Sequence, residues 1–356
     1  MWPDRRLLDL FRIALPVVQA PMAGANGAAM AIAVSEAGGL GSLPCGMLAP
    51  AQAGEEIAAI RKQTSKPGNI NFFCHTPSRL DADRDARWKE RLAPYYHELG
   101  VDAVSTPAVN RTPFDEPMCE IVEAFGPEVV SFHFGLPTNA LLSRVKAAGY
   151  LVISSATTVA EARWLEERGC DAIVAQGAEA GGHRGMFLTD DIATQPGTLA
   201  LVPQIVDAVH VPVIAAGAIA DGRGMAAAFA LGATGAQIGT AYLFTPESLI
   251  SDQHRLAVRG ARGDHTALTN VFSGRPARGL MNRVMKEIGP MSDQVPAFPT
   301  AGRSLAPLKA KAETTGATDF SSLWSGQAAP LCREVGPGTL TRQLAADRLK
   351  ALSATH

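Results

Sequence analysis

The sequence lacks the motifs that identify several large classes of enzyme. It contains no G-x-S-x-G turn, which presents the serine nucleophile of many hydrolases, and no Walker-type lysine loop for a nucleoside triphosphate. No G-x-G-x-x-G follows its first apolar run, and this absence weakens the case for a Rossmann-type dinucleotide fold. The functional residues must therefore be sought in other patterns.

A strong charge of either sign is also missing. The 356 residues include 32 Lys and Arg against 34 Asp and Glu, which gives a formal net charge of −2. No run of Lys or Arg is long enough to form a basic patch, so the sequence predicts no nucleic-acid partner.

Cysteines are few and scattered, and none are spaced as C-x-x-C. This pattern argues against a zinc site or a disulfide framework and favours a reducing, cytoplasmic location. No other cluster has metal-ligand spacing, so we expect no metal. The five cysteines are Cys45, Cys74, Cys119, Cys170 and Cys332.

Long uninterrupted apolar segments are absent as well. Residues 13–35 and 225–244 carry no charge, but glycines and polar residues interrupt both of them, and two prolines interrupt the first. Neither resembles a membrane-spanning helix. At the amino terminus, Asp4, Asp9 and Arg12 interrupt any signal-peptide core. We therefore predict no membrane association.

What the sequence does contain is a regular alternation of short apolar runs and helix-length segments. Such near-continuous apolar runs are typical of parallel strands covered on both faces. Eight of them predict an α/β fold, a closed (β/α)8 barrel of the TIM type, with an open doubly wound sheet as the alternative. The predicted strands are 16–21, 40–44, 69–73, 129–134, 150–154, 172–177, 212–217 and 236–240.

The rhythm of strands stops after residue 244. We predict that residues 1–244 and about 316–356 form the barrel, and that 245–315 form a smaller, mainly helical C-terminal subdomain. The segment 74–128 is too long for one crossover, so we interpret it as an insertion, in which 102–108 is a candidate ninth strand.

In a barrel of this type, reactive residues follow the carboxyl ends of the strands. The glycine-rich segments after the seventh and eighth strands, at Gly217-Ala218 and Gly239-Thr240, would let a backbone approach a phosphate closely. A single phosphate site without a dinucleotide motif favours a mononucleotide such as FMN. The alternative is that these glycines only close the barrel.

The segment AQGAEAGGHRG, residues 175–185, contains the sharpest candidate, His183, because histidine is the commonest general acid–base. His133, at another strand end, is either a substrate contact or a core histidine. The amides of Asn71 and Gln176 suit the pyrimidine edge of a flavin, or else brace a loop. Arg184 either attracts an anionic substrate or forms an ion pair at the rim of the site, and we favour the ion pair.

Six motifs occur in one order between residues 16 and 243: QAPMAG, NINFFCH, SFHFG, QGAEAGGHRG, AAGAIADGRG and QIGT. Together they resemble the nitronate monooxygenases, formerly called 2-nitropropane dioxygenases, of the class I type. The resemblance implies an FMN-dependent monooxygenase that uses O2 to convert alkyl nitronates into a carbonyl compound plus nitrite or nitrate. Propionate 3-nitronate is the expected substrate, and detoxification is the expected role.

The resemblance also implies roles for individual residues. His183 would be the catalytic acid–base and His133 a substrate-binding group. The family often has a second glycine where this chain has Ala218. The residues expected to bind FMN are Ala20, Met22, Asn71, Gln176, Gly181, Gly217, Ala218, Gln237, Ile238, Gly239 and Thr240.

Two rival functions remain open on the sequence alone. The first is an FMN-dependent NADH:quinone reductase or enoyl-acyl-carrier-protein reductase, since these enzymes share a glycine-rich loop that ends in histidine. The second is a flavin-free binding or scaffold barrel. For the monooxygenase, the expected partners are a small-molecule nitronate and O2. We expect a monomer or a homodimer.

Overall fold

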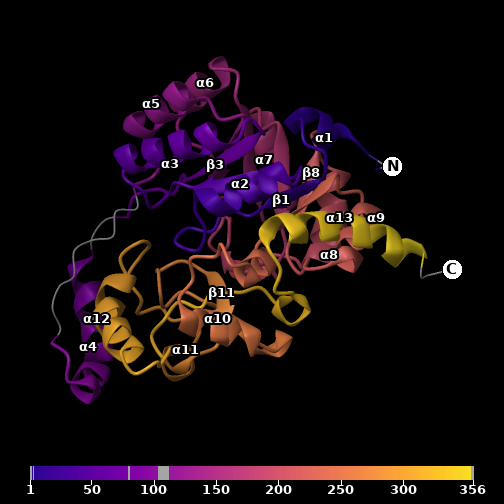
Figure 1. The fold of residues 1–356 in the computed structure, drawn as a ribbon. Helices are drawn as coiled ribbons and strands as arrows, with labels where there is room; N and C mark the ends of the chain where they lie inside the picture. Colours follow the sequence, from indigo (N-terminus) through magenta and orange to yellow (C-terminus); the bar gives the residue numbers. More distant parts are fainter. Residues whose placement is uncertain (1, 3, 79–80, 103–111, 354–356) are drawn as a thin grey trace.

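Eight parallel strands form the central sheet, in the order β1-β9-β8-β6-β5-β4-β3-β2 (Figure 1). The computed structural model describes Trp2 and residues 4–78, 81–102 and 112–353. The strands are β1 Val17–Gln19, β2 Gly41–Pro44, β3 Gly68–Phe73, β4 Val129–His133, β5 Leu151–Ala156, β6 Ala172–Gln176, β8 Val213–Ala216 and β9 Gly235–Ile238.

The two edge strands of this sheet, β1 and β2, meet and close it into a barrel. Val18 and Leu40 form a parallel bridge, and the amide of Leu40 donates to the carbonyl oxygen of Val17 at 2.9 Å. The predicted (β/α)8 barrel is therefore confirmed, and the ends of its eight strands differ from the predicted ones by only one or two residues.

Helices cover the outside of the barrel, and one of them closes its amino-terminal end. Val17 belongs to the core between strands and helices, whereas its neighbour Val18 belongs to the barrel interior, as the alternation of side chains along a strand requires. Leu7, Leu8 and Phe11 of α1 complete that interior. In Figure 1, α1 lies at the end of the barrel opposite the orange C-terminal region.

The helices have these bounds: α1 Arg6–Phe11, α2 Ala28–Glu36, α3 Pro50–Gln63, α4 Ala82–Leu99, α5 Glu116–Phe125, α6 Asn139–Ala147, α7 Val159–Glu167, α8 Thr198–Val206, α9 Gly222–Ala230, α10 Asp252–Arg259, α11 Arg283–Ile288, α12 Gly302–Glu313 and α13 Pro337–Ser353. Short 3-10 turns are η1 Ile192–Thr194, η2 Thr240–Phe244, η3 Gly263–His265 and η4 Ala329–Leu331.

A second, smaller sheet lies beyond the carboxyl ends of the barrel strands. It has three antiparallel strands in the order β10-β11-β7, namely Thr266–Thr269, Ala277–Leu280 and Gly182–His183. The segment that contains His183 therefore pairs with the C-terminal region, which the sequence had predicted as mainly helical without these strands.

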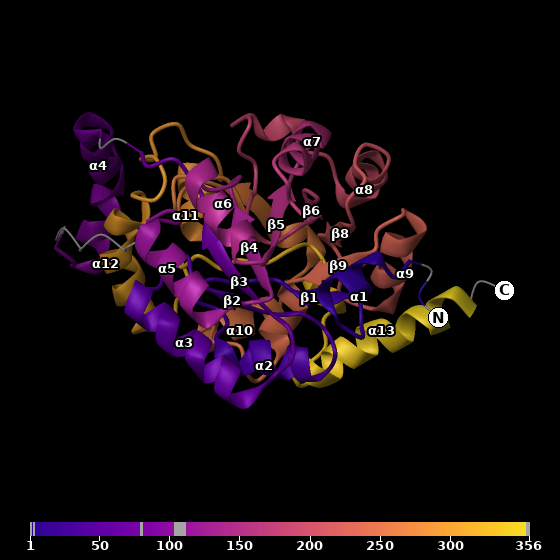
Figure 2. The same cartoon turned by 90° about the horizontal axis from the view of Figure 1, so that it is seen from above.

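The C-terminal region shares its hydrophobic core with the insertion between β3 and β4. Trp88 and Leu92 of α4 are fully buried against residues that include Leu305 and Leu308 of α12. Trp88 Nε1 also donates to the carbonyl oxygen of Ala301 at 3.2 Å. Figures 1 and 2 show α4 and α12 side by side. One compact core is thus built from two segments far apart in the chain.

The remaining parts of the chain complete this arrangement. The tail helix α13 packs along α9 and α2 (Figure 2). The candidate ninth strand falls almost wholly within 103–111, outside the described residues, and the domain boundaries at 244 and 316 stay predictions. Among the described residues, we find no helix that is both long and apolar enough to cross a membrane.

The contact between β2 and α2 yields a stability prediction. A methyl group on Gly41 would lie 1.9 Å from the carbonyl oxygen of Ala31, which is helix backbone and cannot rotate aside. We expect Gly41→Ala to lower the free energy of unfolding by about 3 kcal/mol, measured by urea denaturation. Gly68→Ala, at the first residue of β3 where nothing lies within 4 Å, is the matched control. Equal effects of the two substitutions would contradict this packing.

Candidate active site

Three residues predicted for the site converge on one backbone carbonyl. The carbonyl oxygen of His183 accepts from Gln176 Nε2 at 3.0 Å and from His133 Nε2 at 3.2 Å. Gln176 ends β6 and His133 ends β4, so the carboxyl ends of two barrel strands hold the short strand β7 in place. The barrel rule brought these residues together as expected.

The imidazole of His183 lies among residues of the C-terminal region. Its Nε2 is 2.8 Å from the hydroxyl oxygen of Ser273. Its ring packs edge-on against Phe298, with the ring centroids 5.6 Å apart, and is tilted against Trp324 at 5.4 Å. Phe134 of the barrel completes this apolar surround, at 6.0 Å.

Sequence reasoning missed Ser273, Phe298 and Trp324. They lie about 90 residues or more beyond His183, on elements that do not belong to the barrel rhythm. No local signal marked them, because an ordinary serine and two aromatic residues are also normal core components.

His133 is held as a neutral ring. A carbonyl oxygen only accepts, so Nε2 must carry the proton that it donates to His183, and Nδ1 then accepts from the Ser155 hydroxyl at 3.2 Å. Desolvation lowers the pKa of His133 to about 3, and the charges of Arg275 and Arg184 act in the same direction. Both ring nitrogens thus bond to protein groups, and contact with a substrate stays a prediction.

Gln176 and Asn71 are both buried amides that bond to the protein itself. Gln176 Oε1 accepts from the amide of Gly185 at 2.7 Å, so this side chain braces both sides of the His183 segment. Asn71 Nδ2 donates to the hydroxyl of Ser131 at 2.9 Å. These contacts match the loop-bracing interpretation of the two amides, and their contact with a flavin stays a prediction.

Arg184 does not form the expected ion pair at the rim, and that expectation was wrong. Its side chain is 0% exposed. Its two terminal nitrogens donate to four carbonyl oxygens of the preceding loop, those of Gly177, Ala178, Ala180 and Gly182. Burial, with the nearby charge of Arg278, lowers the pKa of Arg184 to about 9. The guanidinium therefore fixes the conformation of the loop through hydrogen bonds to its backbone.

Residues predicted to bind a flavin from three different strand ends lie close to one another. A methyl group on Gly239 would lie 3.5 Å from Cβ of Ala20 and 3.8 Å from the sulfur of Met22. Gly181 packs against the backbone of the tail, where a Cβ atom would lie 2.5 Å from the amide nitrogen of Gly326. That amide donates to the hydroxyl of Thr240 at 2.9 Å.

The loops after β8 and β9 offer hydrogen-bond donors that the protein itself does not use. Among the described residues, the amides of Gly217, Ala218, Gly239 and Thr240 donate no hydrogen bond within the protein. The two strands are paired neighbours, so these four amides lie at one edge of the barrel. The first amides of α9, by contrast, are capped by the Asp221 carboxylate. The loops, and not that helix, form the candidate anion site.

Ala218 sits in this anion site with an unusual backbone conformation. Its φ of 57° is in the left-handed region, where a side chain is disfavoured and glycine is the common residue. The methyl group leaves the amide available but adds strain, which fits the resemblance-based expectation of glycine at this position.

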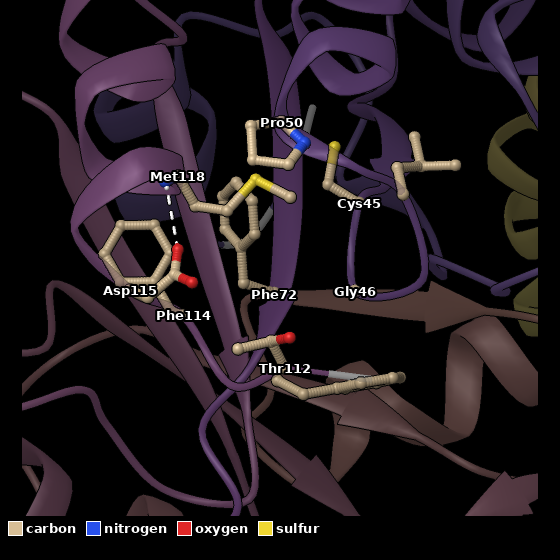
Figure 3. Close-up of a pocket in the computed structure, with 10 residues that line it drawn as sticks. Cys45, Gly46, Pro50, Phe72, Thr112, Phe114, Asp115 and Met118 are labelled. Atoms are coloured by element: carbon tan, nitrogen blue, oxygen red, sulfur yellow. Dashed lines mark hydrogen bonds between the residues drawn. The ribbon is translucent and has the colours of Figure 1, made fainter. Parts of the chain in front are cut away.

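A small cavity of about 30 Å³ lies beside the carboxyl ends of β2 and β3 (Figure 3). Cys45, Phe72, Phe73 and Met118 are among its lining residues, and Asp115 caps α5 next to it by accepting from the amide of Met118. None of the residues predicted to hold a flavin lines it. It has room for about one or two water molecules, so it is not the cofactor site.

Comparison with known proteins places this fold and site in a family. A family model described as nitronate monooxygenase matches residues 4–347. The chain is 41% identical to a nitronate monooxygenase of Paraburkholderia phytofirmans, over 96% of this chain and 94% of the relative. It is 40% identical to one of Pseudomonas aeruginosa, over 95% and 97%.

Two solved structures are similar over nearly the whole chain. A nitroalkane oxidase from Streptomyces ansochromogenes has a TM-score of 0.89 at 37% identity, covering 99% of this chain and 100% of its own. FabK from Thermotoga maritima has a TM-score of 0.75 at 27% identity, covering 98% and 97%. The fold and site therefore define a barrel oxidoreductase. The chain belongs to the nitronate monooxygenase family.

The neutral state of His133 makes stability depend on pH. Because its pKa is about 3 in the folded protein against an ordinary 6.5, the unfolded chain binds one more proton between these values, and stability falls as the pH falls. We expect His133→Gln to reduce the slope of unfolding free energy against pH by about 1 kcal/mol per pH unit between about pH 4 and 6.

Denaturant titrations at several pH values would measure this slope. His254, whose pKa burial lowers to about 4, remains in both proteins and contributes equally to each. His210→Gln, at a side chain that is 99% exposed, is the matched control. An unchanged slope in His133→Gln would mean that His133 is not held neutral.

Proposed function

We propose that this protein is an FMN-dependent nitronate monooxygenase, which oxidises alkyl nitronates with O2 to a carbonyl compound plus nitrite or nitrate. Propionate 3-nitronate is the substrate we favour, in a detoxifying role. The observation that carries the proposal is the position of His183, held by two strand ends among aromatic rings, in a chain of this family. A cytoplasmic enzyme, monomeric or homodimeric, is part of the same proposal.

The donor set fits the phosphate of FMN. Four unused amides at Gly217, Ala218, Gly239 and Thr240 can surround an anion, and small residues at these positions allow close approach. Ala20 and Met22 lie next to Gly239, and with Gly181 they are the residues we expect beside the rest of the cofactor. Bound FMN would supply the redox chemistry, taking electrons from the nitronate and passing them to O2.

His183 is the residue to which we assign proton transfer. The Ser273 hydroxyl has one proton and donates it to the carbonyl oxygen of Arg275 at 3.2 Å, so its oxygen accepts from His183 Nε2. We assign the exchange of the substrate proton to the imidazole of His183. A protonated ring attracts an anionic nitronate, and a neutral ring removes the α-proton of a neutral nitroalkane.

The aromatic residues around His183 strengthen such interactions. Phe134 and Phe298 are buried and pack edge-on against the imidazole, which limits the access of water. In a less polar surround, the attraction between an imidazolium and a nitronate is larger than in bulk water.

One set of measurements tests the proposed function. The purified protein is expected to show a flavin spectrum, or to gain one with added FMN, and to consume O2 with propionate 3-nitronate. NADH oxidation with a quinone is measured in parallel. A colourless protein that FMN cannot reconstitute would overturn the proposal, and NADH turnover without nitronate-dependent O2 uptake would establish a reductase.

The role of His183 has a sharper test. We expect His183→Asn to keep its flavin and to lose most of its turnover on neutral nitroalkanes, by about 100-fold or more, because the asparagine cannot take the α-proton. The loss on preformed nitronates should be smaller. His97→Asn, on the exposed face of α4, is the control. Wild-type turnover on nitroalkanes would give His183 a structural role only.

A further inference from the structure

Three arginines surround the His183 segment, and none has a carboxylate partner within 4 Å among the described residues. Arg184 follows His183 directly, Arg278 pairs with Gly182 across β11 and β7, and Arg275 donates to the carbonyl oxygen of Met186. No acidic side chain belongs to the undescribed residues. The positive charge of the segment is therefore not neutralised by a direct ion pair among these residues.

Three acids act on these arginines from a distance: Asp190 and Glu161 on Arg275, and Glu179 on Arg184 and Arg278. Two of the three carboxylates are bonded to other groups. The Glu161 carboxylate accepts from Thr157 and from the amides of Phe187 and Leu188. The Glu179 carboxylate accepts from the amide and the hydroxyl of Thr198. Because neither carboxylate is in contact with a guanidinium, each neutralises the arginines only at longer range.

Two of the three guanidiniums are committed to the backbone. Arg184 is enclosed by the carbonyls of its own loop. Arg278 donates to the carbonyl oxygen of Ala178 at 2.8 Å and to the hydroxyl of Thr266 at 3.1 Å. The donors of both side chains are therefore largely used within the protein, and what both offer to a ligand is mainly their charge.

Arg275 differs from the other two because it is only half-buried and its Nη1 has no acceptor among the described residues and is not enclosed. Its Nε, like the Nε of Arg184, is buried without an acceptor. Its guanidinium carbon lies 4.2 Å from the centroid of the Phe134 ring, the same ring that packs edge-on against His183. The backbone of Arg275 also bonds to Ser273, the partner of His183.

We propose that Arg275 is a specificity-determining residue, which binds a second anionic group of the substrate while His183 faces the nitronate. A planar guanidinium with unused N–H groups matches a carboxylate in geometry and charge. In propionate 3-nitronate one CH2 group separates the carboxylate from the nitronate carbon, and both Arg275 and His183 contact the ring of Phe134. This assignment rests on the proposed function.

The test compares two substrates that differ only at this group. Propyl-1-nitronate has a methyl group where propionate 3-nitronate has its carboxylate. We expect Arg275→Met to lower the ratio of their kcat/KM values by about 30-fold, while kcat/KM for propyl-1-nitronate changes about threefold or less. Arg275→Lys, which keeps the charge but not the planar set of donors, should lose less of this ratio than Arg275→Met. Added salt should lower the ratio in the wild type but not in Arg275→Met.

The controls separate recognition from structural damage. Arg262→Met removes an arginine whose side chain is 67% exposed and which pairs with Asp264 in the same region, and it should leave the ratio unchanged. Equal losses on both substrates in Arg275→Met, or no loss on either, would overturn the assignment.

A binding measurement keeps this inference separate from the proposed function. Calorimetric titration of the FMN-loaded protein under nitrogen compares 3-nitropropionate with 1-nitropropane, without turnover. The wild type should prefer the carboxylate and Arg275→Met should not. If the wild type oxidises no nitronate yet shows this preference, the proposed function fails while the anion site stands; if it oxidises nitronates without the preference, the anion site fails alone.

Discussion

The shape of the loop between β6 and β7 depends on one buried guanidinium. The loop is mostly glycine and alanine, so few side chains are available to pack. Its conformation therefore depends on hydrogen bonds to its backbone carbonyls. Three of its carbonyls, and the carbonyl of Gly182 in β7, accept from Arg184, which would otherwise be a costly charge to bury. Removing the cation would take a hydrogen-bond donor from each of those carbonyls, and the strand that contains His183 would lose that support.

This internal constraint lets one segment serve both halves of the molecule. The carbonyl of His183 is held by side chains of the barrel, Gln176 and His133, while its ring meets Ser273 and Trp324 of the C-terminal region. The site therefore exists only at the junction of the two parts. Three arginines without direct ion pairs lie at the same junction, which suits the binding of an anion.

The sequence revealed the barrel because parallel strands covered on both faces need unbroken apolar runs, and eight such runs are present. It also located His133, Gln176 and His183, since the ends of such strands form the site. It did not reveal the role of Arg184, because the carbonyls that bind it belong to the backbone and have no sequence signature. The sequence did not reveal the roles of Ser273 and Arg275 either, because their neighbours depend on how the C-terminal region folds back onto the barrel.

The shared core of α4 and α12 has a consequence for the recombination of enzymes in this family. A chimera that exchanges residues 245–315 alone would bring in a partner for Trp88 and Leu92 that never evolved beside them. The transferable unit is discontinuous and consists of the C-terminal region together with residues 82–99. Exchanging both pieces would keep the apolar contacts intact and move the C-terminal surroundings of His183 as one block.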